Sequence, residues 1–126
     1  MKFSLLMIIT AVVALIFGLG FILVPAQSLS LYGVTLNLSG LFVARYFGSA
    51  LLGVAVLAWL ARNAPASIAR QAIVLGLFVL SVTGFVVALF DKFMGPANAL
   101  VWINVVIYLL LALGFGYFAF IKKGDT

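Results

Sequence analysis

Arg45 is the residue whose type fits its surroundings least in this sequence. It lies about six residues inside an apolar segment, 39–61, where an ionised side chain is costly unless it faces a partner or a polar cavity. On a helix, Gly48, Ser49 and Gly53 would follow Arg45 on the same face, and such small residues let another helix approach closely. We therefore expect the guanidinium of Arg45 to point into the protein or along a seam between helices.

Three further polar residues could meet Arg45 at one depth. Asp91 follows the apolar segment 68–90 and is the only acidic residue outside the C-terminal tail. Asn104 and Tyr108 lie four residues apart in the last apolar segment, which would place them on one face of a helix. The sequence therefore predicts a polar cluster of Arg45, Asp91, Asn104 and Tyr108 near one end of a helical bundle.

Three roles are open for this cluster. An Arg45–Asp91 pair could lock two helices together, and Asn104 could form an interhelical hydrogen bond without contacting a ligand. Arg45 could instead extend its long side chain to a lipid phosphate at the membrane surface. The cluster could also bind a small ligand or an ion, because charged residues within membrane segments often mark such sites.

Few residues of the chain could support catalysis. The sequence contains no cysteine and no histidine, which excludes thiol catalysis, histidine-ligated haem and the usual zinc and copper sites. General acid–base chemistry would depend on Asp91 and Tyr108 alone, and proton-coupled transport lacks a carboxylate in the middle of a segment. We predict that the protein is not an enzyme and has no catalytic residues, no metal site and no cofactor.

The elements that must position these residues are four long apolar segments, which take up almost the whole chain: 3–24, 39–61, 68–90 and 97–121. Each is close to the ~20 residues that a helix needs to cross the hydrocarbon core of a membrane. With 67% hydrophobic and 7% charged residues, the chain is too apolar for a water-soluble domain. Because backbone polar groups in lipid must be bonded internally, each segment should be a transmembrane helix. We predict an all-α four-helix transmembrane bundle, a single domain over residues 1–126, with antiparallel neighbours.

The positions of the basic residues predict how the bundle lies in the membrane. With short loops, most of them fall on one side of the bundle: Lys2, Arg62, Arg70, Lys122 and Lys123. Because Lys and Arg concentrate on the cytoplasmic side, we expect both termini in the cytoplasm. The same distribution accounts for the net charge of +5 without nucleic acid as a partner.

The longest connection between the segments, 25–38, can fold in two ways. Pro25 is suited to open a short helix and Gly33 to close it, and this helix would lie in the membrane interface. The alternation of polar and apolar residues in the same stretch also fits an extended turn. We favour the short interfacial helix.

Pairs of small residues four positions apart recur in all four segments. They predict close packing between helices and are compatible with self-association. The pairs are Ala14 and Gly18, Ala44 and Gly48, Ser49 and Gly53, Gly84 and Ala88, and Ala112 and Gly116.

One stretch of the second segment resembles known proteins. The sequence GLFVARYFG at residues 40–48, followed by LLG at 51–53 and AWLAR at 58–62, looks like the second helix of small bacterial inner-membrane proteins that carry a domain of unknown function. The chain is also loosely similar to DoxX-type four-helix proteins, in which an arginine followed by spaced glycines occurs near the start of a span. Both resemblances imply a four-helix membrane protein, and the first implies that it lies in a bacterial inner membrane. Neither implies a reaction or a ligand.

These observations favour a non-catalytic integral membrane protein that serves as an accessory or scaffold subunit of a membrane assembly. Four spans leave almost no mass outside the membrane for soluble partners. The expected partners are therefore membrane lipids, further copies of the chain or a larger membrane complex. The alternative is a lipid- or small-ligand-binding protein, or a carrier, that uses the polar cluster around Arg45.

Overall fold

The computed structural model describes residues 2–95 and 97–121, and this part of the chain is helical with no strand. Four of its helices are long and apolar enough to cross a membrane, counting α5 together with the π-helix η1 that continues it. The elements are α1 (Phe3–Leu23), α2 (Pro25–Ser30), α3 (Leu38–Ala61), α4 (Ile68–Met94), α5 (Val101–Gly116) and η1 (Tyr117–Ile121). The predicted all-α four-helix bundle is confirmed, and its composition is that of a multi-pass membrane protein.

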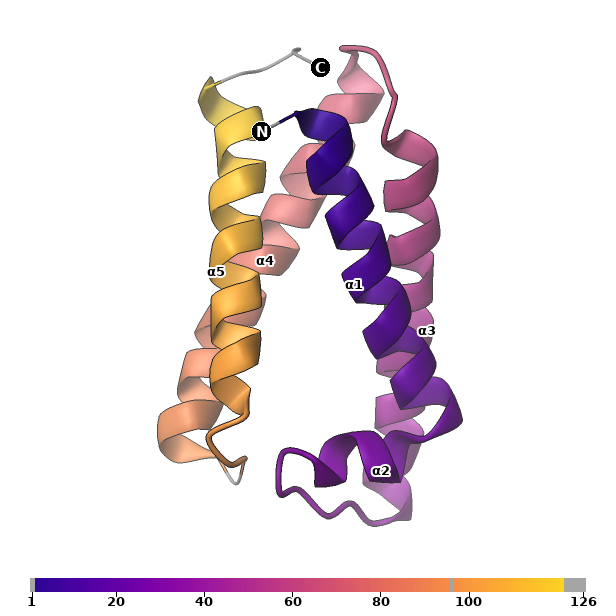
Figure 1. Cartoon of the computed structure of the whole chain (residues 1–126), viewed down its shortest axis with the longest axis vertical. Coiled ribbons are helices and arrows are strands. Elements are labelled where there is room, and N and C mark those ends of the chain that lie inside the picture. Colours follow the sequence, from indigo (N-terminus) through magenta and orange to yellow (C-terminus); the bar gives the residue numbers. More distant parts are fainter. Residues whose placement is uncertain (1, 96, 122–126) are drawn as a thin grey trace.

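The four long helices form two antiparallel pairs. α1 packs along α3 and α4 packs along α5, whereas α1 touches α5 only slightly and α3 scarcely touches α4. Figure 1 shows the pairs close together at the end where α1 begins and η1 ends, and diverging toward the end where α2 lies. We call these the terminal end and the α2 end of the bundle.

The α1–α3 pair depends on two glycines that let the helix backbones approach. A Cβ atom added to Gly48 would lie 2.8 Å from the carbonyl oxygen of Gly18 and 3.1 Å from the amide nitrogen of Ile22, so no larger residue fits there. Ala14 and Ala44, one turn away on the two helices, are buried beside this crossing. The prediction that small pairs pack helices together is confirmed for Ala14–Gly18 and Ala44–Gly48, whereas Ser49 and Gly53 are exposed and Gly53 has no neighbour within 4 Å of an added Cβ.

The α4–α5 pair uses a glycine in a different way. Gly84 leaves the space that the Tyr108 ring fills, since a Cβ atom at this position would lie 2.6 Å from Cδ1 of the ring. Further along the same pair, the Phe78 and Phe120 rings meet edge to face with their centroids 5.3 Å apart. An aromatic ring set against a glycine or another ring gives the close contact that helices in lipid need.

The largest group of buried residues lies at the terminal end and joins the two pairs. Phe3 of α1 packs edge to face on Phe118, with ring centroids 5.4 Å apart, and the guanidinium carbon of Arg70 lies 3.9 Å from the centre of the Phe3 ring. The side-chain amide of Gln71 donates a hydrogen bond to the carbonyl oxygen of Ala119 at 3.0 Å. The terminal end is therefore the best-packed part of the bundle, and its core includes Phe3, Leu6, Met7, Val74, Leu77, Phe115 and Phe118.

The connections differ from the prediction in one place and agree in another. α4 continues to Met94 instead of ending at 90, so Asp91 lies within the helix, and α5 starts at Val101 instead of 97. The predicted short helix after Pro25 is confirmed as α2. Gly33 follows it with a φ of 73°, a left-handed conformation that glycine adopts without strain.

Replacing Gly48 with leucine should destabilise the α1–α3 pair, because the new side chain meets the backbone of α1. We expect a loss of about 1–3 kcal/mol in the free energy of unfolding, the usual cost of overpacking. The measurement is thermal unfolding followed by circular dichroism in excess detergent. Gly53→Leu is the matched control on the same helix, because an added Cβ there meets nothing within 4 Å. Equal losses in the two variants would contradict the proposed crossing.

Candidate functional site

The polar residues that the structure brings together lie at the α2 end. Asn104 of α5 accepts a hydrogen bond at Oδ1 from the hydroxyl of Tyr32, at 2.7 Å, across 72 positions of sequence. Tyr32 follows α2 and is only 8% exposed. Tyr108 lies one turn beyond Asn104 on α5, where its ring covers Gly84. Two of the four predicted residues therefore share a site, and Tyr32 joins them.

Asn98 extends this contact through the backbone. Its amide N–H donates to the carbonyl oxygen of Tyr32 at 2.7 Å, and its side-chain amide donates to the carbonyl oxygen of Leu31 at 3.1 Å. We call Tyr32, Asn98 and Asn104 the polar bridge. It ties the segment after α2 to the start of α5, and so it connects the two helix pairs at the end where they diverge.

A shallow groove of about 300 Å³ lies beside the polar bridge, between α1, α2 and the start of α5. Its walls are mostly apolar, with Phe17 and Phe21 on one side and Leu100 and Ile103 on the other, and its polar members are Ser28 and Tyr32. A larger apolar groove of about 490 Å³ follows the α1–α5 seam toward the terminal end. Both grooves have the composition to accept hydrocarbon, and neither presents a nucleophile next to a base.

The hydroxyl of Tyr32 stays protonated at ordinary pH. Burial raises the pKa of Tyr32 above its usual value of 10.0. A neutral phenol is the form that can donate to the Asn104 carbonyl oxygen. The polar bridge is therefore a neutral connection across the physiological pH range.

The structure does not bring Arg45 to this site, and its side chain does not point into the protein. The other expected position, along a seam between helices, stays a prediction. Arg45 is exposed, and it forms no hydrogen bond or ion pair with another residue within 2–95 or 97–121. The face of α3 that packs on α1 contains Ala44 and Gly48 instead. A helix turns by about 100° per residue, so Arg45 lies to the side of that contact.

Asp91 is half-buried near the end of α4, and it too makes no ion pair among the residues that the structure describes. The Arg45–Asp91 lock is thus not formed. The same described residues contain no group of three or more His, Cys, Asp or Glu side chains that could hold a metal ion.

The sequence analysis missed a second polar contact, at the terminal end. Arg70 was assigned only to the charge asymmetry, yet it is 3% exposed, and besides covering Phe3 it donates to the carbonyl oxygen of Ala64 at 3.4 Å. Ser67 caps the start of α4 by accepting a hydrogen bond from the backbone N–H of Arg70. A serine three residues before Arg70 was therefore a local signal that Arg70 lies in the first turn of a helix. Tyr32 offered no comparable signal, because its partners are remote in sequence.

No family model, no curated protein and no solved structure matches this chain. The resemblance of residues 40–62 to small bacterial membrane proteins therefore stays a prediction. The fold and the site define the class: a small multi-pass membrane protein made of two helix pairs, with neutral polar contacts at one end and an aromatic core at the other.

Tyr32→Phe removes the hydroxyl of the polar bridge and leaves Asn104 without its partner. We expect the free energy of unfolding to fall by about 1 kcal/mol, the usual net value of such a hydrogen bond. The measurement is thermal unfolding of both proteins in the same detergent. Tyr46→Phe is the matched control, because Tyr46 is 65% exposed. A similar loss in Tyr46→Phe would show that the bridge is not the cause.

The contribution of the polar bridge should also depend on pH in one direction only. Because the pKa of Tyr32 is raised in the folded protein, the stabilisation is fully present below pH 10.0, the ordinary value, and is lost as the pH rises through the raised pKa. The difference in stability between the natural protein and Tyr32→Phe is the quantity to follow between pH 7 and 11. A difference that declines already near neutral pH would contradict the assignment.

Proposed function

We propose that this protein is a non-catalytic accessory or scaffold subunit of a membrane assembly, which packs within the bilayer against further copies or a larger complex. The proposal extends to a bacterial inner membrane with both termini in the cytoplasm. The observation that carries it is the exposure of small residues on the outer faces of α3 and α4.

Two glycines on these faces have no packing role inside the chain. A Cβ atom added to Gly53 of α3 or Gly76 of α4 would meet nothing within 4 Å, unlike those at Gly18, Gly48 and Gly84. Glycine in a helix interior lowers the stability of the helix by about 1 kcal/mol relative to alanine. At Gly53 and Gly76 no close contact within the chain offsets this cost. A partner helix that packs on the face would supply the gain.

The neighbouring residues on both faces are also small, so a partner helix could approach the backbone closely. Ser49 lies one turn before Gly53, and Ala72 lies one turn before Gly76, and all four residues are exposed. Each helix thus repeats, on its outside, the spacing that packs α1 on α3. Because α3 and α4 scarcely touch, both faces are available from the surrounding membrane.

The polar residues support a structural role over catalysis or transport. The most deeply buried hydroxyls, those of Thr10 and Ser81, donate to carbonyl oxygens of their own helices, at 2.9 and 2.7 Å. The polar bridge is likewise satisfied by protein groups. The alternative function is a lipid- or small-ligand-binding protein, or a carrier, that uses the polar cluster around Arg45. It has less support because Arg45 is exposed and forms no hydrogen bond with Asn104, whose partner is Tyr32.

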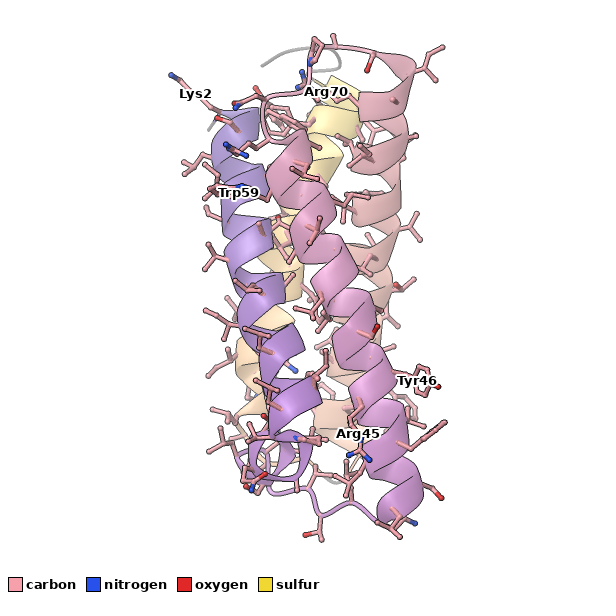
Figure 2. The ribbon with its side chains drawn as sticks, turned by 90° about the vertical axis from the view of Figure 1, so that its right-hand side faces the viewer. Lys2, Arg45, Tyr46, Trp59 and Arg70 are labelled. Atoms are coloured by element: carbon pink, nitrogen blue, oxygen red, sulfur yellow. The ribbon has the colours of Figure 1, made fainter. Side chains whose placement is uncertain are left out.

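The charge distribution supports the proposed orientation. Figure 2 shows Lys2 and Arg70 at the terminal end and Arg45 toward the α2 end. Arg62 follows α3 at the terminal end, with its guanidinium carbon 4.0 Å from the centre of the Trp59 ring. Lys122 and Lys123, outside the described residues, follow η1 in the sequence. The richer basic side would face the cytoplasm.

Gly53→Leu and Gly76→Leu should weaken association without unfolding the chain, because an added Cβ at either position has open space around it. We expect the stoichiometric assembly, measured by native mass spectrometry after gentle extraction, to be lost or reduced at least about tenfold in affinity, or 1.4 kcal/mol. Val12→Leu enlarges an exposed side chain of α1 and is the matched control.

Disulfide cross-linking in the native membrane gives a second measurement. The chain has no cysteine of its own, so a single Ser49→Cys or Ala72→Cys assigns any cross-link to one face. Self-association predicts a dimer in one of these variants, and a heteromeric assembly predicts a mixed adduct. The proposed function would be contradicted if the natural protein were extracted as a monomer and neither cysteine variant gave a cross-linked dimer or a mixed adduct.

A further inference from the structure

Arg45 lies on the surface of α3 with no counter-charge in the part of the chain that the structure describes. Asp91 is the only acidic residue in that part, and it does not pair with Arg45. An arginine stays ionised in proteins, so the charge needs a partner or water. The partner has to come from the surroundings of the helix.

The packing of α1 on α3 fixes the depth of Arg45. A Cβ atom at Gly48 would lie 2.9 Å from Cγ1 of Ile22, and α1 ends one residue later at Leu23. Arg45 precedes Gly48 by three residues, a rise of about 4.5 Å toward the start of α3. It therefore lies at the level where α1 ends and α2 begins. In a bilayer crossed by the four long helices, this level would be near the edge of the hydrocarbon layer.

Two exposed aromatic side chains lie at the same level of α3, on the neighbouring side of the helix. The rings of Phe42 and Tyr46 lie 4.8 Å apart between centroids, and their side chains are 56% and 65% exposed. Figure 2 shows Arg45 and Tyr46 at the α2 end of α3, with Tyr46 pointing away from the other helices. Exposed aromatic residues of this kind concentrate at the boundary between the hydrocarbon and the headgroups.

We propose that Arg45 binds the phosphate of a phospholipid headgroup in the leaflet on the α2 side. The planar guanidinium can donate two parallel hydrogen bonds to phosphate oxygens, and the exposed aromatic pair lies against the adjoining glycerol and acyl region. A phosphodiester supplies the missing negative charge at the depth where Arg45 lies. The site fixes the depth and rotation of α3 in the bilayer.

The test uses the full chain in an uncharged detergent, with phosphatidylglycerol as the probe. Native mass spectrometry counts retained lipid, and thermal unfolding measures the stabilisation that added lipid gives. Dioleoylglycerol, which has no phosphate, and inorganic phosphate, which has no acyl chains, are the comparison probes. The variants are Arg45→Leu, Arg45→Lys and the control Lys92→Leu, which removes another cation at the α2 end.

We expect the natural protein and Lys92→Leu to retain phosphatidylglycerol equally. Arg45→Leu should bind it about tenfold more weakly. Arg45→Lys should bind with intermediate affinity, because lysine keeps the positive charge but cannot donate the two parallel hydrogen bonds of a guanidinium. Arg45→Lys also keeps the test valid if the leucine variant fails to fold. Equal binding by the natural protein and both Arg45 variants overturns the proposal. Equal stabilisation by dioleoylglycerol, or by inorganic phosphate alone, also overturns it.

Discussion

Helices inside a membrane gain little from burying apolar side chains against one another, because the lipid around them is equally apolar. Association therefore depends on close van der Waals contact and on a few polar bonds. In this protein the close contact is the crossing of Gly18 and Gly48, where the backbones of α1 and α3 meet. The rest of the arrangement follows from it, since it fixes the register between α1 and α3 and hence the depth of every residue on α3.

The two ends of the bundle are held together by different chemistry. At the terminal end, Phe3, Phe118 and Arg70 give a tightly packed aromatic contact with a cation over one ring. At the α2 end, the polar bridge connects the pairs through hydrogen bonds of Tyr32 and Asn98. Between these ends α1 touches α5 only slightly, so the two pairs behave as separate units joined at both ends.

Hydropathy predicted the four spans and the fold class because a long apolar run has no other stable structure in lipid. The rotation of each helix was harder to predict, since helices that are apolar on all sides carry little periodic signal. α3 shows why: Ala44 and Gly48 form one small-residue face, and Ser49 and Gly53 form another. Arg45 lies on the same face as Ser49 and Gly53, so the sequence analysis expected that face to pack inside the bundle. In the structure the face with Ala44 and Gly48 packs against α1 instead.

Only the part of the candidate site that lies on one helix could be predicted from the sequence. Asn104 and Tyr108 share a face because they lie four residues apart on one helix, and that follows from local geometry alone. Tyr32 belongs with them only through a contact across 72 residues, which depends on how α2 turns back over the bundle. No local pattern carries that information, and Gly33 marked the turn without giving its direction.

The distribution of polar groups also limits how such a protein can be recognised within a membrane. Its deeply buried hydroxyls are bonded to its own backbone, and its exposed charge at the α2 end, Arg45, lies near the start of α3 and not in the middle of the helix. The exposed middle of α3 and α4 therefore offers a partner no charge to pair with. Selectivity there has to come from shape, and an open glycine such as Gly53 is the feature of shape that a neighbouring helix can read.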